Sequence, residues 1–509
     1  MRVGLDLEGT ITCISSFGDL KNKLTQAPLS LKMSGTQELI LKGARAAFAS
    51  GKTRDLTFRE TQLRGLLRLL IEHEDDILEA LHKDLRKAKL EGSIYELEVV
   101  KAEAISVLKH LKEYASKEHL PINALGALDR GYILREPYGL VLILGAWNYP
   151  FTLTFKPLIG AIAAGNCVVI KPSEVSAESA SIMAKLLPKY IDPVCYPVVL
   201  ADVDGTKSLL KNKFDYIFYT GSSSVASSIL QAAAPNLTPV TLELGGKSPC
   251  YIDDSADFKL AAKRILWGKV MNLGMTCIAP DYLLCSRSAQ EEFVKVTHQV
   301  MKEWYGSEKL QSQPDLPRII NKRHHQRIKH LLDTTKGNII YGGETDEEDL
   351  WIEPTIVVDV QSNDSLMQDE IFGPILPIVN VNSPEEAVDF ILDKPKPLAL
   401  YVFSKKQEVY NKMIESTSSG GVCINDVVWQ NAWHGLPFGG VGNSGMGNYH
   451  GKYSFDTFSH KRGVLIRGFS YLSEKLGEAR YPPYTPDKLK FFKLILKYFE
   501  ACNVTFSPL

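Results

Sequence analysis

Strand-like and helix-like segments alternate along the chain from residue 139 to residue 222. The runs "GLVLILG" and "CVVIKPS" have the continuous hydrophobicity of strands that are buried on both faces of a sheet. "PLIGAIAAGN" and "SAESASIMAKLLPKY" have helical spacing, and "YPVVLADV" and "FDYIFYTGS" are two more strand-like runs. Strands that alternate with helices form a parallel sheet that helices cover on both faces. The sequence therefore predicts an α/β fold.

A second alternating region follows Gly245, with the helical "RIINKRHHQRIKHLLD" and the strand-like "WIEPTIVVDV" and "PLALYVFS". A chain of 509 residues is too long for one ordinary hydrophobic core, so we expect two parallel-sheet α/β domains. Residues 35–115 have helical spacing, and Thr57 with Glu60 matches the capping box that begins a helix. From residue 425 to residue 460 the chain is rich in Gly, Asn and Ser, which predicts loops with short strands.

The charge and the cysteine content limit the classes of partner and compartment. Lys and Arg number 58 against 59 Asp and Glu, so the basic excess of a nucleic-acid-binding protein is missing and we expect no nucleic-acid partner. Eight cysteines without regular spacing favour reduced thiols, and hence the cytoplasm, over a disulfide framework. We see no signal peptide and no apolar run of about 18 residues, so we expect no membrane-spanning helix.

Cys277 and Glu243 are a candidate nucleophile and a candidate base. A turn over residues 276–279 that opened a helix would stabilise the Cys277 thiolate through backbone N–H groups. Glu243 lies in the apolar "VTLELGG", which would raise the pKa of its carboxyl toward a useful range. A buried inert thiol and a salt-bridged glutamate are the structural alternatives. No second Cys or His stands at ligand spacing near Cys277, so we expect no metal site.

Asn148 is a candidate for holding negative charge. Open parallel sheets bind ligands beyond the carboxyl ends of their strands, and Asn148, Lys171 and Gly221 follow the ends of three predicted strands. A side-chain amide and a backbone N–H can hold the charge that builds on a carbonyl oxygen during thiolate attack. An asparagine before Tyr-Pro is otherwise an ordinary turn residue. The literal G-x-G-x-x-G of residues 440–445 lacks a preceding strand and a following helix, so we interpret it as a loop.

Four segments together resemble the aldehyde dehydrogenase superfamily: "GAWNYPF", "TLELGGKSPC", "WGKVMNLGMTCIAP" and "PFGGVGNSGMG". "NYHGKYSFDTFSHKR" is most similar to the class 3 branch, and the similarity covers residues 36–467. The resemblance implies a homodimer with the fold of that family. It divides the chain into an N-terminal extension (1–34), an NAD-binding domain (35–115 and 138–244), a catalytic domain (245–424), a β-rich bridging and oligomerisation segment (116–137 and 425–462) and a C-terminal tail (463–509).

The resemblance implies a role for each matched residue. Cys277 attacks the aldehyde, Asn148 and the Cys277 backbone N–H hold the oxyanion, and Glu243 activates the water that hydrolyses the thioester. NAD accepts the hydride, with NADP as an alternative. The Glu174 carboxylate favours NAD because it repels a 2′-phosphate. The residues assigned to the cofactor are Lys171, Glu174, Gly221, Ser222, Val225, Glu370 and Phe372.

Two positions depart from the family pattern. Met275 stands where the family usually has Gln or Glu, and a flexible apolar Met can fill that volume. Ala226 stands where the family usually has a second Gly, and its methyl group would press on the cofactor. Neither change removes a group that the chemistry needs, so we expect a modest loss of cofactor affinity.

Aromatic residues near the motifs indicate an apolar substrate entrance. They favour medium- or long-chain aliphatic aldehydes, or aromatic aldehydes, as substrates. Two alternatives stay open: a catalytically weakened relative that acts as a binding protein, and a thiol esterase that needs no cofactor. The aromatic residues are Trp147, Tyr149, Trp429 and Trp433.

The two ends of the chain lie outside the resemblance. The first residues, with Asp6 and Glu8, are predicted to be an extension without a catalytic role. Residues 488–499 have the pattern of a basic amphipathic helix, with Phe492 and Ile495 on its apolar face. We interpret this helix either as a peripheral contact with the cytosolic face of a membrane or as a helix docked over the substrate entrance. Cys502 is a candidate for S-acylation.

Overall fold

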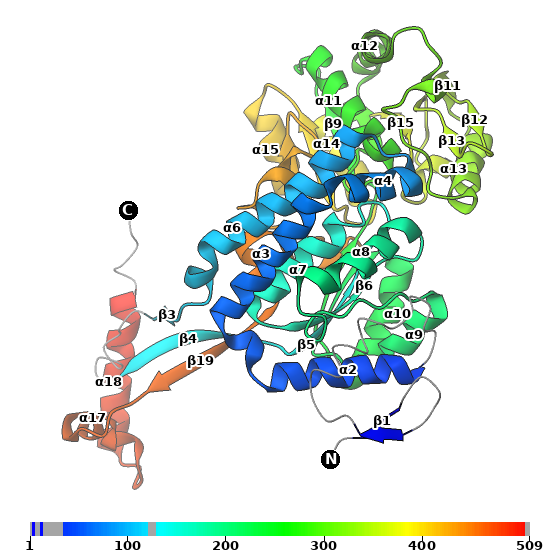
Figure 1. Cartoon of the computed structure of the whole chain (residues 1–509). Coiled ribbons are helices and arrows are strands. Elements are labelled where there is room, and N and C mark those ends of the chain that lie inside the picture. The colour runs from blue at the N-terminus through cyan, green and yellow to red at the C-terminus, as the bar shows by residue number, and fades with distance from the viewer. Residues whose placement is uncertain (1–2, 6–10, 14–33, 121–128, 504–509) are drawn as a thin grey trace. The chain divides into compact units, whose positions relative to one another are not determined.

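The computed structural model describes residues 3–5, 11–13, 34–120 and 129–503, and it divides into two compact units (Figure 1). The first unit comprises Met1–Leu111 and Tyr138–Phe458, and the second comprises Lys112–Pro137 and Ser459–Leu509. Asp6, Glu8 and the side chain of Cys502 lie outside the described part, as does most of the N-terminal extension. Within that extension, β1 (Val3–Leu5) and β2 (Ile11–Cys13) form an antiparallel pair.

Helices make up the first stretch of the first unit, as their spacing predicts. The capping-box prediction at Thr57 is wrong by two residues, because the carboxylate of Asp55 caps the helix that follows and accepts the backbone N–H of Thr57. A six-residue π-helical turn, η2 (Ser93–Glu98), interrupts the later helical stretch. The helices are α2 (Ser34–Ala49), α3 (Leu56–Glu72), α4 (Glu74–Leu85), α5 (Lys89–Gly92) and α6 (Val99–Tyr114).

A five-stranded sheet forms where the first alternation predicts it, in the order β18-β8-β7-β5-β6. The strands β5 to β8 are parallel to their neighbours, and β18 is antiparallel. Helices α2 and α7 pack on β5 and β6, and α10 packs on β7 and β8. The strands are β5 (Leu140–Leu144), β6 (Cys167–Lys171), β7 (Tyr216–Gly221), β8 (Val240–Leu244) and β18 (Gly445–Met446), and the helices between them are α7 (Thr152–Ala164), α8 (Ala177–Tyr190), α9 (Val203–Leu210) and α10 (Ser223–Ala233).

One predicted strand of this region is absent. "YPVVLADV" makes a single bridge, between Val198 and Ile170, and then leads into α9. Pro197 has no backbone N–H to donate, and Asp202 caps α9 four residues after Val198. The segment between Pro197 and Asp202 is therefore too short to form a ladder with β6.

The second alternation forms a seven-stranded sheet in the order β11-β14-β15-β10-β9-β16-β17, in which β11 alone is antiparallel to its neighbour. Its apolar residues form one large buried core. The strands are β9 (Pro249–Ile252), β10 (Tyr282–Cys285), β11 (Asn338–Tyr341), β14 (Thr355–Val358), β15 (Ile375–Asn380), β16 (Ala399–Phe403) and β17 (Gly421–Ile424), and the helices are α11 (Phe258–Val270), α12 (Arg287–Tyr305), α13 (Lys322–Thr334), α14 (Pro384–Leu392) and α15 (Gln407–Ser416).

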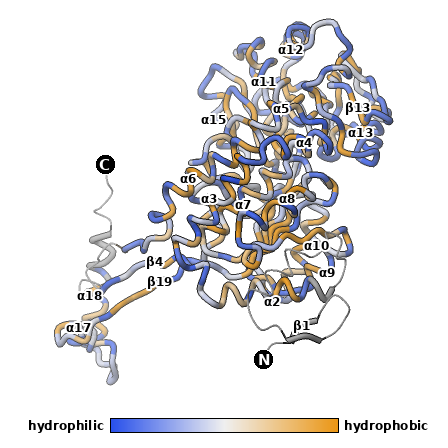
Figure 2. The backbone as a smooth tube through the Cα atoms, in the orientation of Figure 1, coloured by the Kyte–Doolittle hydropathy of each residue, from blue (hydrophilic) through white to orange (hydrophobic). Residues whose placement is uncertain are grey.

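Two parallel sheets with helices packed on them confirm the predicted α/β class. Every residue of α7 is buried, and α7 lies toward the hydrophobic end of the scale in Figure 2, whereas α13 is mostly hydrophilic. The division of this unit into an NAD-binding and a catalytic domain near Gly245 stays a prediction.

The second unit contains an antiparallel three-stranded sheet and the tail. The sheet has the order β19-β4-β3, and its strands are β3 (Glu118–His119), β4 (Arg130–Pro137) and β19 (Ser459–Ile466). The tail forms α17 (Tyr471–Gly477) and α18 (Pro486–Asn503). In α18 the predicted apolar residues Phe492 and Ile495 are half-buried, while Phe491 and Leu494 are exposed. Across the described residues, each helix is too short or too polar to cross a membrane.

Candidate active site

The parallel strands of the smaller sheet bring predicted site residues to one edge. In the sheet register, Leu144 at the end of β5 pairs with Lys171 at the end of β6, and Thr220 near the end of β7 pairs with Glu243 of β8. Asn148 follows four residues after Leu144. Because all these strand ends have the same direction, their side chains lie along one edge, as the sequence predicts.

Cys277 lies in a turn between the short helix η5 (Met271–Gly274) and β10 of the larger sheet. The prediction that this turn opens a helix is wrong, because the chain continues into a strand after Pro280. The turn is held by side chains from elsewhere. The Tyr149 hydroxyl lies 2.8 Å from Thr276 Oγ1, and the Tyr401 hydroxyl donates to the carbonyl oxygen of Ile278 at 2.5 Å.

The thiol of Cys277 is held in its neutral form. Burial is the main cause that raises its pKa above the ordinary value, and the carboxylates of Glu370 and Glu243 raise it further. Backbone N–H groups at Cys277 and Ile278 act in the opposite direction and are too weak to reverse the shift. These interactions place Glu370 and Glu243 within electrostatic range of the thiol. A thiolate at neutral pH therefore requires a neighbouring base.

Glu243 has the environment that its apolar segment predicts. Its side chain is 3% exposed, and neither carboxylate oxygen has a hydrogen-bond partner among the described residues. Burial raises the pKa of this carboxyl well above its usual value. An unbonded carboxylate with a raised pKa is a stronger base than an exposed one, and the alternative of a salt-bridged strand-end glutamate is excluded.

Asn148 is buried and fixed by its own backbone and side chain. Its Nδ2 donates to the carbonyl oxygen of Met275 at 3.0 Å, two residues before Cys277. Its carbonyl oxygen accepts from Lys87 Nζ at 3.0 Å and from Asn272 Nδ2 at 2.9 Å. A side-chain amide has two N–H donors, so one donor of Asn148 stays available for a ligand.

Glu370 and Phe372 lie in the loop between η7 (Ser365–Met367) and β15. Burial and the neighbouring Asp281 raise the pKa of Glu370 to about 8. A Cβ added at Gly245 would collide with the Glu370 carboxylate, so this approach requires glycine. Phe372 adopts a left-handed backbone, with a φ of 46°, and its ring contacts Trp147 edge-on at 5.4 Å between centroids. Glu370 therefore lies beside the strand end that follows Glu243, and Phe372 lies beside the loop that follows β5.

The remaining predicted cofactor residues form a rim in which Glu174, Ser222 and Val225 are exposed, Gly221 is half-buried and Lys171 is buried. Lys171 and Glu174 form an ion pair. Ser222 precedes the first turn of α10, and Ser222 to Val225 are exposed, so the N-terminal N–H groups of this eleven-residue helix are accessible to an anion. Ala226 is 2% exposed, so its methyl group is part of the protein interior rather than of this rim, against the expectation that it presses on a ligand.

One interpretation of a weaker motif, the loop at residues 440–445, is confirmed. Residues 440–445 form a loop that ends in β18, where Gly445 pairs with Glu243 through the backbone. His325 is buried and its Nε2 lies 3.0 Å from the carbonyl oxygen of Trp351. In the part of the chain that the structure describes, no cluster of three His, Cys, Asp or Glu side chains is suited to a metal ion.

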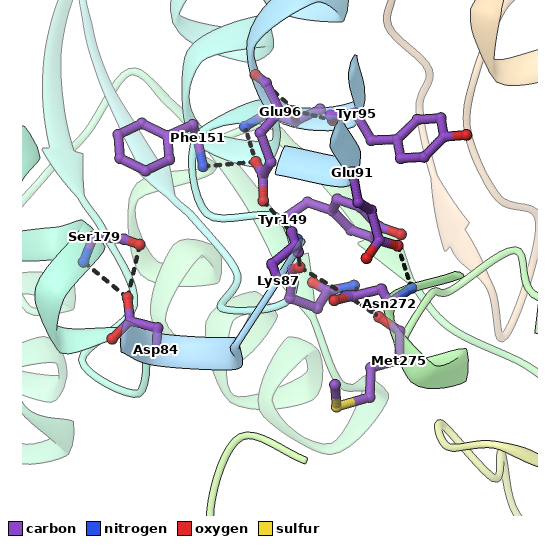
Figure 3. Close-up of polar contacts among 12 residues, drawn as sticks. Asp84, Lys87, Glu91, Tyr95, Glu96, Tyr149, Phe151, Ser179, Asn272 and Met275 are labelled. Atoms are coloured by element: carbon purple, nitrogen blue, oxygen red, sulfur yellow. Dashed lines mark hydrogen bonds and ion pairs between the residues drawn. The ribbon is translucent and has the colours of Figure 1, made fainter. Parts of the chain in front are cut away.

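A buried polar network next to Asn148 is missed by the sequence analysis. It consists of Lys87, Glu91, Glu96 and Asn272, which come from two segments about 180 residues apart (Figure 3). Lys87 Nζ bonds Glu96 Oε1 at 2.9 Å, and both side chains are inaccessible to solvent. Charged residues in helical sequence are ordinarily exposed, so no local signal identifies these as buried.

The site combines a thiol that needs a base, two nearby carboxyl groups and an amide donor at the carboxyl edge of a parallel sheet. This combination suits covalent catalysis through cysteine. The model of the aldehyde dehydrogenase family matches residues 25–464, and the chain belongs to this family.

Individual relatives narrow the resemblance to family 3. The chain is 50% identical to aldehyde dehydrogenase family 3 member A2 of the rat (Rattus norvegicus) over 452 residues, which cover 89% of this chain and 92% of the relative. It is 47% identical to the human (Homo sapiens) aldehyde dehydrogenase family 3 member B1 over 465 residues, which cover 91% of this chain and 98% of the relative. A solved structure, the substrate-bound state of Staphylococcus aureus AldH, matches with a TM-score of 0.87 and 41% identity over 90% of this chain and 99% of that chain. The resemblance to the class 3 branch is thus confirmed.

Proposed function

We propose that this protein oxidises medium- or long-chain aliphatic aldehydes, or aromatic aldehydes, to carboxylic acids with NAD, and with NADP as an alternative. Family membership supports the reaction class. The observation that carries the assignment of the site is the buried, unbonded carboxyl of Glu243 within electrostatic range of the Cys277 thiol. A base and a nucleophile in that relation are what thioester chemistry requires.

In the first step the Cys277 sulfur attacks the aldehyde carbon and forms a thiohemiacetal. The thiol proton passes to a neighbouring carboxylate, because the raised pKa of Cys277 prevents spontaneous ionisation at neutral pH. The free N–H of the Asn148 amide and the backbone N–H of Cys277 hold the negative oxygen. Glu370, whose pKa is about 8, and Glu243 are the two carboxyls in range for this proton.

The cofactor residues suit the successive parts of a dinucleotide. The N-terminus of α10 suits the pyrophosphate, Lys171 and Glu174 suit ribose hydroxyls, and Glu370 with Phe372 suit the nicotinamide end. When bound, nicotinamide supplies a hydride acceptor, which no side chain of the site provides. In the last step Glu243 removes a proton from water, which attacks the thioester carbon and releases the acid and the Cys277 thiol.

The substrate class follows from a cavity of about 190 Å³ beside the Cys277 turn. Ile278 of that turn lines it, and apolar residues such as Val422, Leu436 and Phe438 make up most of its wall. Trp429 and Trp433 are more than half exposed in the same loop region. A wall of this kind favours a hydrocarbon chain or an aromatic ring over a sugar or an amino acid.

The test is the formation of reduced nicotinamide by purified protein with a series of aldehydes of increasing length, with NAD and NADP in parallel. We expect activity with long and aromatic aldehydes, and none with Cys277→Ala. Ester hydrolysis without any reduced cofactor would favour the thiol esterase alternative. Cofactor binding without turnover would favour the weakened relative, with Met275 as the first position to restore to Gln.

Oligomerisation and location are part of the same proposal. We expect a homodimer in which residues 116–137 and 425–462 contribute to assembly, and light scattering of the full chain tests its mass. We expect a cytoplasmic protein whose α18 makes peripheral contact with a membrane, because Phe491 and Leu494 are exposed among Lys490, Lys493 and Lys497. Sedimentation with anionic and neutral vesicles tests this contact, and binding to neither would favour the helix docked over the entrance.

A further inference from the structure

One asparagine side chain joins the two loops that carry the proposed oxyanion donors. Asn272 Nδ2 donates to the carbonyl oxygen of Asn148 at 2.9 Å and to the carbonyl oxygen of Met275 at 3.0 Å. The first carbonyl belongs to the loop after β5, and the second lies two residues before Cys277. Both N–H donors of the Asn272 amide are therefore used, one for each loop.

The backbone of Asn272 is in an uncommon conformation that needs support. Asn272 and Leu273 have φ angles of 49° and 50°, and Gly274 has a φ of 72°, so three consecutive residues are left-handed. A Cβ at Gly274 would also collide with the carbonyl oxygen of Gly373. The support comes from Glu91, whose Oε1 accepts the backbone N–H of Asn272 (Figure 3). Without this bond, a buried N–H would have to find another acceptor.

The segment that contains Glu91 also holds the loop that carries Asn148. Lys87 Nζ donates to the Asn148 carbonyl oxygen and to Glu96 Oε1, and it lies 4.2 Å from the centre of the Tyr149 ring. Glu96 Oε2 accepts the backbone N–H groups of Phe151 and Thr152, where α7 begins. Residues 87–96 therefore hold the Asn148 loop through Lys87 and Glu96, and the Cys277 turn through Glu91.

We propose that Glu91 and Asn272 are positioning residues that set the distance and orientation between the Asn148 amide and the Cys277 backbone N–H, so that both donors meet one oxyanion. This inference rests on the proposed function of Asn148 and Cys277. The backbone carbonyl oxygens of Asn148 and Met275 each already accept two hydrogen bonds. The second N–H of Asn148 is thus left for the oxyanion.

The expected effect is large because oxyanion donors act only within a narrow range of distance. A misplacement of about 1 Å can lower the rate about 100-fold. Loss of the positioning bonds should lower kcat, since the oxyanion exists in the transition state and not in the bound aldehyde. The KM for the aldehyde and the Kd for NAD should stay close to the wild-type values.

The decisive variant is Asn272→Gly. Glycine adopts the left-handed backbone without strain and has no amide, so the turn keeps its conformation while the two loops lose their connection. Glu91→Ala removes the backbone acceptor, and Glu91→Gln restores an acceptor oxygen and should recover most of the activity. Asp215→Ala is the matched control, because Asp215 accepts the backbone N–H of Leu140 next to Gly139, a residue with positive φ, at the opposite end of β5.

The full-length protein is assayed for aldehyde oxidation, for hydrolysis of 4-nitrophenyl acetate, and for alkylation of Cys277 by iodoacetamide. Hydrolysis requires the oxyanion site but no cofactor, and alkylation requires the thiol but no oxyanion. We expect Asn272→Gly and Glu91→Ala to lower kcat of both reactions about 10- to 100-fold at an unchanged alkylation rate. Asp215→Ala and Glu91→Gln should stay near wild type.

Wild-type kcat in Asn272→Gly would overturn the inference. So would a fall in alkylation that parallels the fall in kcat, because the network would then only maintain the fold of the turn. A wild-type protein that oxidises no aldehyde would contradict the proposed function instead, and ester hydrolysis would then decide the role of the network. If Glu91→Ala does not fold, the comparison of Asn272→Gly with wild type decides alone.

Discussion

Glu96 and Glu243 are both buried carboxyls with a raised pKa, yet their surroundings are opposite. Glu96 is inaccessible to solvent, pairs with Lys87 and accepts two backbone N–H groups. Glu243 is nearly as buried and has no hydrogen-bond partner in the described structure. A fold ordinarily satisfies its buried charges. The contrast indicates that Glu96 stabilises the fold. Glu243 stays unpaired, at a cost in stability, because the proposed reaction needs a free carboxyl there.

Glu243→Gln should have the largest effect on activity. Loss of a general base typically lowers the rate about 10²- to 10⁴-fold, and here thioester hydrolysis should fall while formation of the acyl-enzyme persists. A burst of reduced nicotinamide followed by a slow steady state is the expected signal. Loss of both the burst and the steady state would place Glu243 in the first step instead.

The same variant should stabilise the protein at alkaline pH. The folded-state pKa of Glu243 is raised, so its contribution to stability is complete below the ordinary value near 4.5 and is lost as the pH rises. Replacing it by an uncharged amide removes this loss. Glu243→Gln should therefore unfold at a higher temperature than wild type at pH 8, and the gain should disappear near pH 5. A lower melting temperature at pH 8 would contradict the comparison with Glu96.

Lys87→Met tests the other carboxyl of the comparison, Glu96, by removing its cation. It leaves Glu96 buried with a charge and no cation, which typically costs about 3–5 kcal/mol of unfolding free energy. Urea denaturation measures the loss. Lys101→Met is the control, since its partners Glu74 and Glu98 are partly exposed and the pair should contribute about 1 kcal/mol or less. Equal losses in the two variants would show that burial does not distinguish these ion pairs.

Glu370→Gln should sharpen the electrostatic account of the thiol. The carboxylate of Glu370 raises the pKa of Cys277, and its own pKa is about 8, so its charge is present mainly above that pH. Without this charge the thiolate forms more readily. The midpoint of iodoacetamide alkylation against pH should move to lower pH by up to about one unit. A midpoint that moves upward would show that Glu370 assists ionisation.

Asp55→Ala should give the smallest effect, because this cap is at the surface. Loss of an N-cap carboxylate typically costs about 1 kcal/mol, measured by urea denaturation. Thr57→Ala should change the unfolding free energy by about 0.5 kcal/mol or less, since the Thr57 side chain does not cap α3. A larger loss of unfolding free energy in Thr57→Ala than in Asp55→Ala would support the capping box that the sequence predicts at Thr57.

Local pattern was sufficient for most of the fold. Continuous apolar runs predicted β5, β6 and β7 because strands buried on both faces have no polar positions. The local pattern failed at "YPVVLADV", which has the apolar run of a strand. Pro197 at its start and the helix cap Asp202 near its end leave no room for a ladder beyond Val198. It also failed at Cys277, where a turn without a strong stop signal was interpreted as a helix start and is followed by β10.

The surroundings of the candidate site depend on tertiary packing and could not be predicted. The environment of Glu243 was predictable, because its immediate neighbours in the strand, Leu242 and Leu244, are apolar. The burial of Lys87 and Glu91 was not, because their partners Asn148 and Asn272 come from distant segments. The same holds for Glu370, whose approach to Gly245 joins two loops that are 125 residues apart.

The left-handed run from Asn272 to Gly274 also has a consequence for how the sequence can vary. Leu273 is fully buried, so a glycine there would relieve the backbone and leave a cavity, while most other residues would keep the backbone strain. Asn272 tolerates few replacements for the same backbone reason, and Gly274 tolerates none with a side chain. In a saturation-mutagenesis screen these three positions should accept fewer substitutions than Thr276, and most of the losses there should be failures of folding rather than of chemistry.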